Sequence, residues 1–402
     1  GGRMATIDCD GYRVDTAASI LPTTYTEMFR LIDDAGLTSE VFPTSDVIGV
    51  LRDGKVHHMR SHAKTDALTT GLISWRGKAT LTRLLSDILR AGDRLDWYDL
   101  GRAADLDTET ARQYADRRLT PELLEYIVAT PCRALFLAEP ERLSVVDVFF
   151  AVRNILGGSF FNSATGADFL PRGLARHLDV ELSVQVTSVE ERNGSVTVTW
   201  QHSGEPERTE DVAACVIAVP AHHMLALYPQ LDPVRREVAQ RIEYSTCVDV
   251  TVGLSRPPAE PSMMLQIPRQ EHPDLCVIVL DHNKAPGRAP QGKGLLTTYW
   301  HDAWGKEQWD RDDKEVVEDA LAGLDRIFPG IGDQVDMTHV SRWRSCAVMS
   351  RPGLYRDLAR FTAATDRRSP VQLAGDYLSA TTTNASLCSG ERAAQRITEA
   401  RR

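Results

Sequence analysis

Residues 374–394 read AGDYLSATTTNASLCSGERAA, and this stretch decides the fold of the chain. The apolar run Val371–Ala374 predicts a short buried strand that leads into Gly375 and Asp376. Gly375 lets a ligand approach the backbone closely because it has no side chain. Asp376, at the end of the strand, can accept hydrogen bonds from hydroxyl groups of a ligand.

A helix is expected directly after this turn, from about Ala385 to Ala400, with Thr383 and Asn384 as candidates for its N-cap. The free N–H groups and the positive end of such a helix can hold negative charge. Spacing alone fits two interpretations equally well. One is a ligand-binding turn, and the other is a structural strand–turn–helix connection, which is common in α/β proteins.

The composition is that of a globular protein of two to three domains at roughly 150 residues each. The chain has 402 residues, of which 42% are apolar and 25% are charged, and its net charge is -10. This charge argues against nucleic acid and anionic membranes as partners. No apolar run reaches the roughly 18 residues of a membrane span, and no signal peptide is visible.

The seven cysteines are scattered, odd in number and contain no CxxC pair. A disulfide framework or zinc site is therefore not expected, and the cysteines fit a reducing, cytoplasmic compartment. His57, His58 and His62, and the pair His222 and His223, lack carboxylates at metal-ligand spacing. Surface or core histidines are the better interpretation, so no metal is expected.

Turn signals and hydrophobic periodicity predict a mixed α/β (α+β) chain. Hairpins are expected at Asp10-Gly11, Asp53-Gly54 and Asn193-Gly194. A helical block is expected over 78–156, and strands at 245–254, 275–281 and 294–300 predict one antiparallel sheet. Helices are also expected over 24–35, 168–177 and 315–328. The apolar run Cys215–Val219 predicts a strand buried on both faces.

Sheet segments at the start, middle and end of the chain predict one domain made of three discontinuous pieces. We assign residues 1–45, 157–222 and 336–402 to this domain. Residues 46–156 and 223–335 would then form a second domain, which contains the helical block and faces the first.

The stretch at 374–394 resembles the C-terminal flavin-binding motif of the superfamily of amine oxidases, protoporphyrinogen oxidases and phytoene desaturases. Gly375 and Asp376 match that motif, as do Ser389, Gly390, Ala393 and Ala394. Ala385 stands where the family usually has Gly, and Ser386 where it usually has Ala. The resemblance implies a Rossmann-like domain that binds FAD, with Asp376 on the ribityl hydroxyls and Ala385, Ser386 and Leu387 beside the flavin.

The opening residues extend this resemblance. Gly1, Gly2, Arg3 and Met4 are similar to the family's GGR motif, whose glycines pass the cofactor and whose arginine reaches towards its phosphates. Gly11–Asp15 resembles the segment that follows this motif. Val186 corresponds to the valine beside the adenine ring. Val219 lies in a stretch similar to the strand that runs under the cofactor.

One part of the family pattern is not found. The family begins with a strand and a GxGxxG loop, whose glycines let a helix N-terminus hold the pyrophosphate. A βαβ unit of roughly 35 residues would precede the GGR motif. We therefore expect the sequence to be part of a longer flavoprotein. Two alternatives are a missing piece supplied by another chain and a protein that does not bind the flavin.

Two further groups of residues have alternative interpretations. A cysteine near the position of Cys346 carries covalent flavin in some amine oxidases, but different spacing and flanking residues favour a buried structural cysteine here. Residues 299–301 (Tyr-Trp-His) and Trp304 fit either a substrate cavity or an aromatic cluster at the end of a sheet.

The resemblance implies an FAD-dependent oxidase or desaturase. The flavin would take hydride from a C–N or C–C bond of a lipophilic or polycyclic small molecule and pass the electrons to oxygen or another acceptor. The lack of an obvious acid–base pair counts little against an enzyme, because in this superfamily the cofactor carries the chemistry. The alternative is a flavin-independent or inactive homologue, such as an isomerase, a cyclase or a binding subunit.

Overall fold

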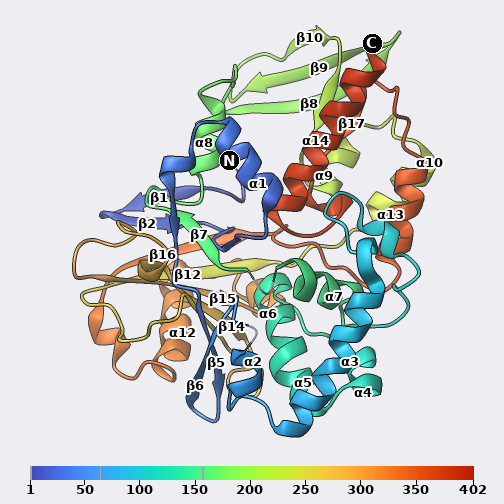
Figure 1. The fold of residues 1–402 in the computed structure, drawn as a ribbon. Helices are drawn as coiled ribbons and strands as arrows, with labels where there is room; N and C mark the ends of the chain where they lie inside the picture. Colours follow the sequence, from blue (N-terminus) through green and yellow to red (C-terminus); the bar gives the residue numbers. More distant parts are fainter. Residues whose placement is uncertain (1, 64, 156–157) are drawn as a thin grey trace.

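The computed structural model describes residues 2–63, 65–155 and 158–402. The fold is mixed α/β, with α14 and a small sheet in the upper part of Figure 1, a large sheet below them, and helices gathered at the lower right. Within the described ranges, no helix has both the length and the apolar composition needed to span a bilayer.

The large sheet has seven strands in the order β16-β12-β15-β14-β13-β5-β6. It contains the three predicted strands as β12 (Cys247–Leu254), β14 (Leu275–Leu280) and β15 (Gly294–Trp300), which pair antiparallel as expected. The predicted hairpin of β5 (Val47–Arg52) and β6 (Lys55–Arg60) joins its edge. β5 reaches the sheet through a parallel pairing with β13 (Met264–Gln266).

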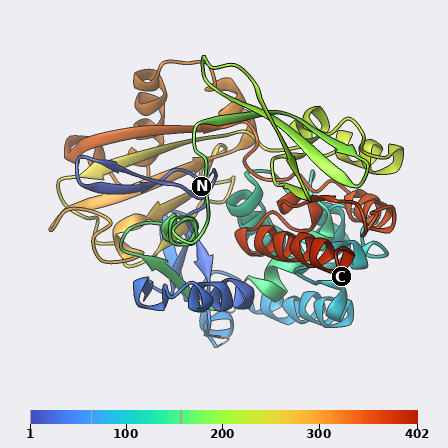
Figure 2. The ribbon, with the colours of Figure 1, turned by 90° about the horizontal axis from the view of Figure 1, so that it is seen from above.

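The two faces of the large sheet have different neighbours. Helix α12 (Asp313–Asp325) covers one face, where Val316 and Leu324 pack against Val250 and Trp300. On the opposite face, which we call the inner face, lie Tyr299 and its neighbours. The hairpin of β1 (Thr6–Cys9) and β2 (Tyr12–Asp15) runs beside this sheet in Figure 2. The Tyr12 hydroxyl donates to Asp336 Oδ1 on β16 (Val335–Trp343) at 2.6 Å.

A separate two-stranded parallel sheet consists of β11 (Cys215–Ile217) and β17 (Val371–Leu373). Helix α14 (Thr383–Ala400) packs on β17, and α1 (Thr26–Asp34) packs on α14 (Figure 1). The third predicted hairpin, β8 (Val184–Arg192) and β9 (Ser195–His202), forms a three-stranded sheet with β10 (Arg208–Val212). A further small sheet has the order β3-β7-β4, from Leu21–Pro22, Phe160–Ser163 and Val41–Pro43.

The predicted helical block is a series of helices, several of which have capped starts. It contains α3 (Trp75–Ala91), which begins three residues before the predicted block, α4 (Ala111–Arg118), α5 (Pro121–Leu123), a π-helical turn at Leu124–Ala129, α6 (Thr130–Phe136) and α7 (Val145–Asn154), while α2 (Asp66–Thr69) precedes it. Ser74, Thr110 and Ser144 each accept a backbone N–H of the first helical turn, which fixes where α3, α4 and α7 begin. Outside the block lie α8 (Phe169–Ala175), α9 (Ala221–Leu227), α10 (Pro233–Gln240), α11 (Asp302–Glu307) and α13 (Leu354–Ala363).

Two local predictions are wrong. Val216 on β11 is 38% exposed and Cys215 is only half-buried, so this strand is not buried on both faces. An apolar run indicates a strand, but its burial depends on which other elements pack against it. The N-cap of α14 is Thr382, whose hydroxyl accepts the Ala385 N–H at 3.1 Å, rather than Thr383 or Asn384.

Candidate functional site

The stretch at 374–394 forms the predicted strand, turn and helix. Gly375 has φ +151°, a conformation that residues with side chains rarely adopt. A Cβ on Gly375 would lie 2.5 Å from the Tyr377 ring. The Gly375 N–H donates to Ser389 Oγ at 2.8 Å, which fixes the turn against the second turn of α14. The chain therefore needs glycine at this position for its backbone shape.

Arg3 and Asp376 lie at opposite ends of the sequence, and the fold brings them into direct contact. The guanidinium donates to both oxygens of the carboxylate, with NH1–Oδ2 at 2.8 Å and NH2–Oδ1 at 3.0 Å. NH1 also donates to the Cys346 carbonyl at 2.6 Å. The Asp376 side chain is 6% exposed and that of Arg3 is 27% exposed. Two predicted cofactor residues therefore bind each other in a largely buried ion pair.

The groups around this ion pair have shifted pKa values. Burial and the Asp376 charge raise the pKa of Tyr244, whose hydroxyl accepts the Ala221 N–H at 3.0 Å. The neighbouring Cys247 thiol, together with the positive charge of Arg3, lowers the pKa of Cys346, although burial opposes this. Cys346 is thus a half-buried thiol beside a cation, in the position where the sequence analysis favoured a structural cysteine.

The remaining predicted residues of the helix start pack against the neighbouring parts of the fold. Ala385 is fully buried, and the Ser386 hydroxyl donates to the Thr382 carbonyl at 3.1 Å. Leu387 and Met4 pack against the same apolar cluster as Tyr25 and Met28. The two ends of the chain therefore meet at the beginning of α14.

Asn384 has a role that the sequence did not indicate. Its Oδ1 accepts the Met28 N–H at 3.2 Å, and its Nδ2 donates to Glu27 Oε2 at 2.8 Å. It ties α14 to α1 instead of capping its own helix. Arg30 and Glu391 form a second link between these two helices.

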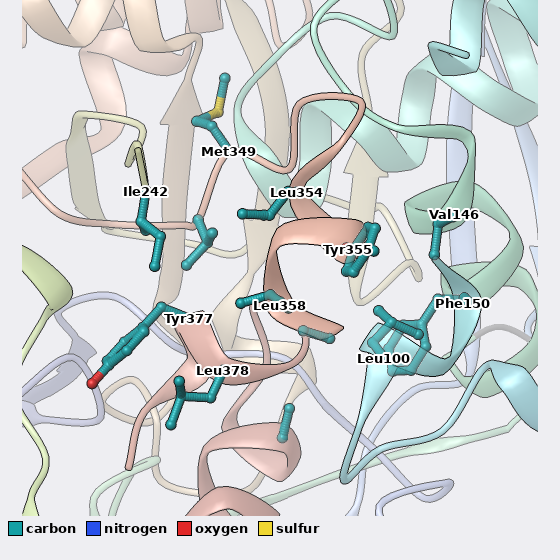
Figure 3. Packing of buried hydrophobic residues seen from close by; sticks show 14 of the residues in the cluster. Leu100, Val146, Phe150, Ile242, Met349, Leu354, Tyr355, Leu358, Tyr377 and Leu378 are labelled. Atoms are coloured by element: carbon teal, nitrogen blue, oxygen red, sulfur yellow. The ribbon is translucent and has the colours of Figure 1, made fainter. Parts of the chain in front are cut away.

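Val186 and Val219 are half-buried and pack against the large core that also contains Val371 and Ala385. Figure 3 shows part of this core, where Leu354, Tyr355 and Leu358 pack together. Gly2 has φ +58° with open space around it. Gly1 lies outside the described residues.

Most of the aromatic and histidine candidates lie in other parts of the fold, whereas His222 lies 5.8 Å from Tyr244 between ring centres and Tyr299 shares an apolar cluster with Cys346. Trp300 stacks on Trp304 at 4.4 Å between ring centres, within the cluster that α12 covers, so both belong to an aromatic cluster in the core. His58 and His62 contact Glu260 and Asp46, each at 2.9 Å. Within the described residues, no three His, Cys, Asp or Glu side chains are grouped closely enough to hold a metal ion.

The fold is that of the FAD-dependent amine oxidases. Cyclohexylamine oxidase from Brevibacterium oxydans is similar over 100% of this chain and 92% of its own, with a TM-score of 0.76 and 17% identity. Putrescine oxidase bound to putrescine is similar over 100% and 91%, with a TM-score of 0.76 and 15% identity. An oxidoreductase from Methanosarcina mazei is similar over 98% and 92%, with a TM-score of 0.70 and 14% identity.

The sequence itself matches one family, the flavin-containing amine oxidoreductases, over residues 1–398. The chain belongs to this family. No curated protein sequence matches it.

Proposed function

We propose that this protein is an FAD-dependent oxidoreductase, either an oxidase or a desaturase. Its family membership supports an oxidoreductase. The observation that carries the proposal is the convergence of Arg3, Asp376 and Gly375 at the N-terminus of α14. These residues come from both ends of the chain and combine a cation, a carboxylate, an open backbone and a positive helix end.

The residues at this position fit FAD. The side chain of Asp376 and the backbone of Gly375 would hold the ribityl chain, Arg3 would face the phosphates, and Val186 would lie beside the adenine. Gly2 and Met4 would border the cofactor, and so would Gly1, Val219, Ala385, Ser386 and Leu387. FAD, when bound, supplies the hydride acceptor.

Two buried polar atoms near the motif support this fit. The Tyr377 hydroxyl and Thr383 Oγ1 have no hydrogen-bond partner within the described part of the chain. The Tyr377 hydroxyl points away from Leu358 and Leu378 in Figure 3. Buried polar groups without partners are rare in proteins, and a ligand is one explanation for them.

We infer two functional domains, with FAD on residues 1–45, 157–222 and 336–402 and the substrate on 46–156 and 223–335. The substrate is proposed to be a lipophilic or polycyclic small molecule that loses hydride from a C–N or C–C bond. Oxygen or another acceptor would then take the electrons. The names of two structural neighbours, cyclohexylamine oxidase and putrescine oxidase, support a small organic substrate.

A second candidate is a flavin-independent or inactive homologue, such as an isomerase, a cyclase or a binding subunit. The ion pair favours it, because Arg3 occupies both oxygens of the carboxylate that would bind the ribityl chain. The parallel sheet among the described residues also has only the strands β11 and β17.

Absorbance spectroscopy separates the two candidates. The purified chain is mixed with FAD, desalted and scanned, and it is then mixed anaerobically with a panel of amines and lipophilic alkenes. Retained flavin that is bleached by a panel member supports the oxidoreductase. Asp376→Asn should release the flavin, whereas Asp66→Asn, in the exposed pair of Asp66 with Arg60, should not. A folded chain that never retains FAD would refute the first candidate.

A further inference from the structure

Three buried aspartates lie on or beside the inner face of the large sheet, and two of them have cations. Lys284 contacts both Asp281, at 2.5 Å, and Asp15, at 3.2 Å. Arg288 contacts Asp15 at 2.5 Å. The third aspartate, Asp249, forms no ion pair within the described residues, although it is completely buried in the middle of β12.

The carboxyl group of Asp249 is also incompletely hydrogen-bonded. Its Oδ2 accepts from Cys247 Sγ at 3.9 Å, and its Oδ1 makes no hydrogen bond of good geometry. Ser341 is its partner across the strands β12 and β16, where a hydrogen bond from Ser341 opposes the rise in the pKa of Asp249, although Ser341 Oγ forms no hydrogen bond of good geometry. The two polar atoms therefore adjoin each other on neighbouring strands, and their poor hydrogen-bond geometry leaves capacity to bind a further polar group.

An isolated carboxylate is very unfavourable in such a place, and the group takes a proton instead. Burial raises the pKa of Asp249 well above its usual range, and the nearby Cys346 thiol acts in the same direction. Burial without a cation thus favours the protonated form of this group, which has an O–H to donate. Its neighbour Tyr299 has other partners, because its hydroxyl donates to the Ala17 carbonyl at 2.9 Å and also contacts the Ser19 hydroxyl at 3.1 Å.

A chain of contacts joins this acid to the candidate cofactor site. Asp249 contacts Cys247, and Cys247 neighbours the Cys346 thiol. The Cys346 carbonyl accepts from Arg3, which binds Asp376. Three residues, Cys247, Cys346 and Arg3, thus connect Asp249 to Asp376, the aspartate proposed to hold the ribityl chain.

We propose that Asp249 is a substrate-binding residue, a neutral carboxylic acid that donates a hydrogen bond to an uncharged oxygen or nitrogen of the substrate. This inference rests on the proposed oxidoreductase function. The matching features are the spare Oδ1, the adjacent Ser341 hydroxyl and the absence of a cation among the described residues. The favoured ligand is a neutral molecule with a hydrogen-bond acceptor, because a neutral acid has a proton to give.

Infrared spectroscopy tests the protonation of Asp249 in the whole protein without any substrate. A protonated carboxyl band is expected in the wild type at neutral pH, and Asp249→Asn should remove it. Asp147→Asn is the matched control, because burial also raises the pKa of Asp147, which lies in α7, away from the large sheet. It should remove a different band. If Asp249→Asn removes no protonated carboxyl band, the proposal is wrong.

Two probes of equal ring size, cyclohexanone and cyclohexylamine, test what the acid binds. Cyclohexanone should shift the Asp249 band, and its affinity should stay within about threefold in Asp249→Asn, which keeps an N–H donor. It should fall by roughly tenfold or more in Asp249→Leu, which has none. Cyclohexylamine binding that abolishes the band and is lost in both variants would overturn the proposal, since the acid would then pair with a cation.

If neither cyclohexanone nor cyclohexylamine shifts the Asp249 band, the proposal is also wrong, because the acid would then not face a ligand. The flavin content of each variant is measured separately by absorbance. Failure of the wild type to retain flavin counts against the proposed function, whereas the infrared bands report on Asp249 in either case.

Discussion

The ion pair of Arg3 and Asp376 can be weighed by removing each partner. Asp376→Asn keeps the shape of the side chain but leaves the Arg3 charge with neutral acceptors. Breaking a fully buried pair costs about 3–5 kcal/mol, and hydrogen bonds to charged groups contribute about 1.5–3 kcal/mol each. Arg3 is 27% exposed, so water partly replaces the lost contact. We therefore expect a loss of about 3 kcal/mol in the free energy of unfolding.

The assay is urea unfolding of the cofactor-free protein, followed by tryptophan fluorescence and circular dichroism. Arg3→Gln should lose a similar amount, because it leaves a buried carboxylate unpaired. The double variant should be more stable than the sum of the two losses predicts, by about 2 kcal/mol. The exposed pair Arg60 and Asp66 is the control, and its disruption should cost much less than either change in the buried pair. Additive effects of Arg3→Gln and Asp376→Asn, or losses no larger than in the control, would refute the reasoning.

Three further changes test the fold around the site. Gly375→Ala should lower the free energy of unfolding by more than about 2 kcal/mol, because φ at this position is +151° and the new Cβ would meet the Tyr377 ring. Gly390→Ala lies within α14, where the new Cβ meets no atom, and it should raise the free energy of unfolding by up to about 1 kcal/mol. The midpoints of urea unfolding show whether the two changes have these opposite signs. The Arg288 and Lys284 charges outweigh burial and lower the pKa of Asp15 to about 2. The ionised Asp15 therefore stabilises the folded protein fully above pH ~4, and this stabilisation is lost as the pH falls towards 2. Asp15→Asn should therefore unfold with a flatter acid limb and be roughly 2 kcal/mol less stable at neutral pH; an unchanged acid limb would contradict this. Thr382→Ala removes the hydroxyl that caps α14 and should cost about 1 kcal/mol, while Thr398→Ala near the other end of the helix should be close to neutral by the same measurement.

The parts of the fold that depend on local chemistry could be predicted from the sequence. At Asp10-Gly11, Asp53-Gly54 and Asn193-Gly194 both residues have positive φ, which is the turn that closes a two-residue hairpin. The strands β12, β14 and β15 were indicated by apolar runs of the right length. In each case the information lies within a few neighbouring residues.

Contacts between distant residues could not be predicted in the same way. The sequence indicated Arg3 and Asp376 separately, as ligands of one cofactor, but gave no sign that they bind each other across 373 positions. Asp249 lies in the strand predicted at 245–254, but nothing in the sequence placed it beside Ser341, which lay in no predicted strand. The exposure of Val216 depends on what packs beside β11, which no single stretch of sequence records.

The ion pair of Arg3 and Asp376 also determines which kind of flavin could replace its contacts. If Asp376 is to hold a ribityl chain, at least one of its oxygens must exchange the Arg3 guanidinium for ligand hydroxyls, and Arg3 must then find a new anion. The phosphates of FAD are such an anion, and arginine suits them because its guanidinium can bind two oxygens at once. A ligand with both hydroxyls and phosphates can therefore replace both halves of the pair, whereas riboflavin, with hydroxyls alone, would leave Arg3 unpaired. On this argument the pair favours a phosphorylated flavin over riboflavin, and it keeps the buried charges satisfied while the ligand is absent.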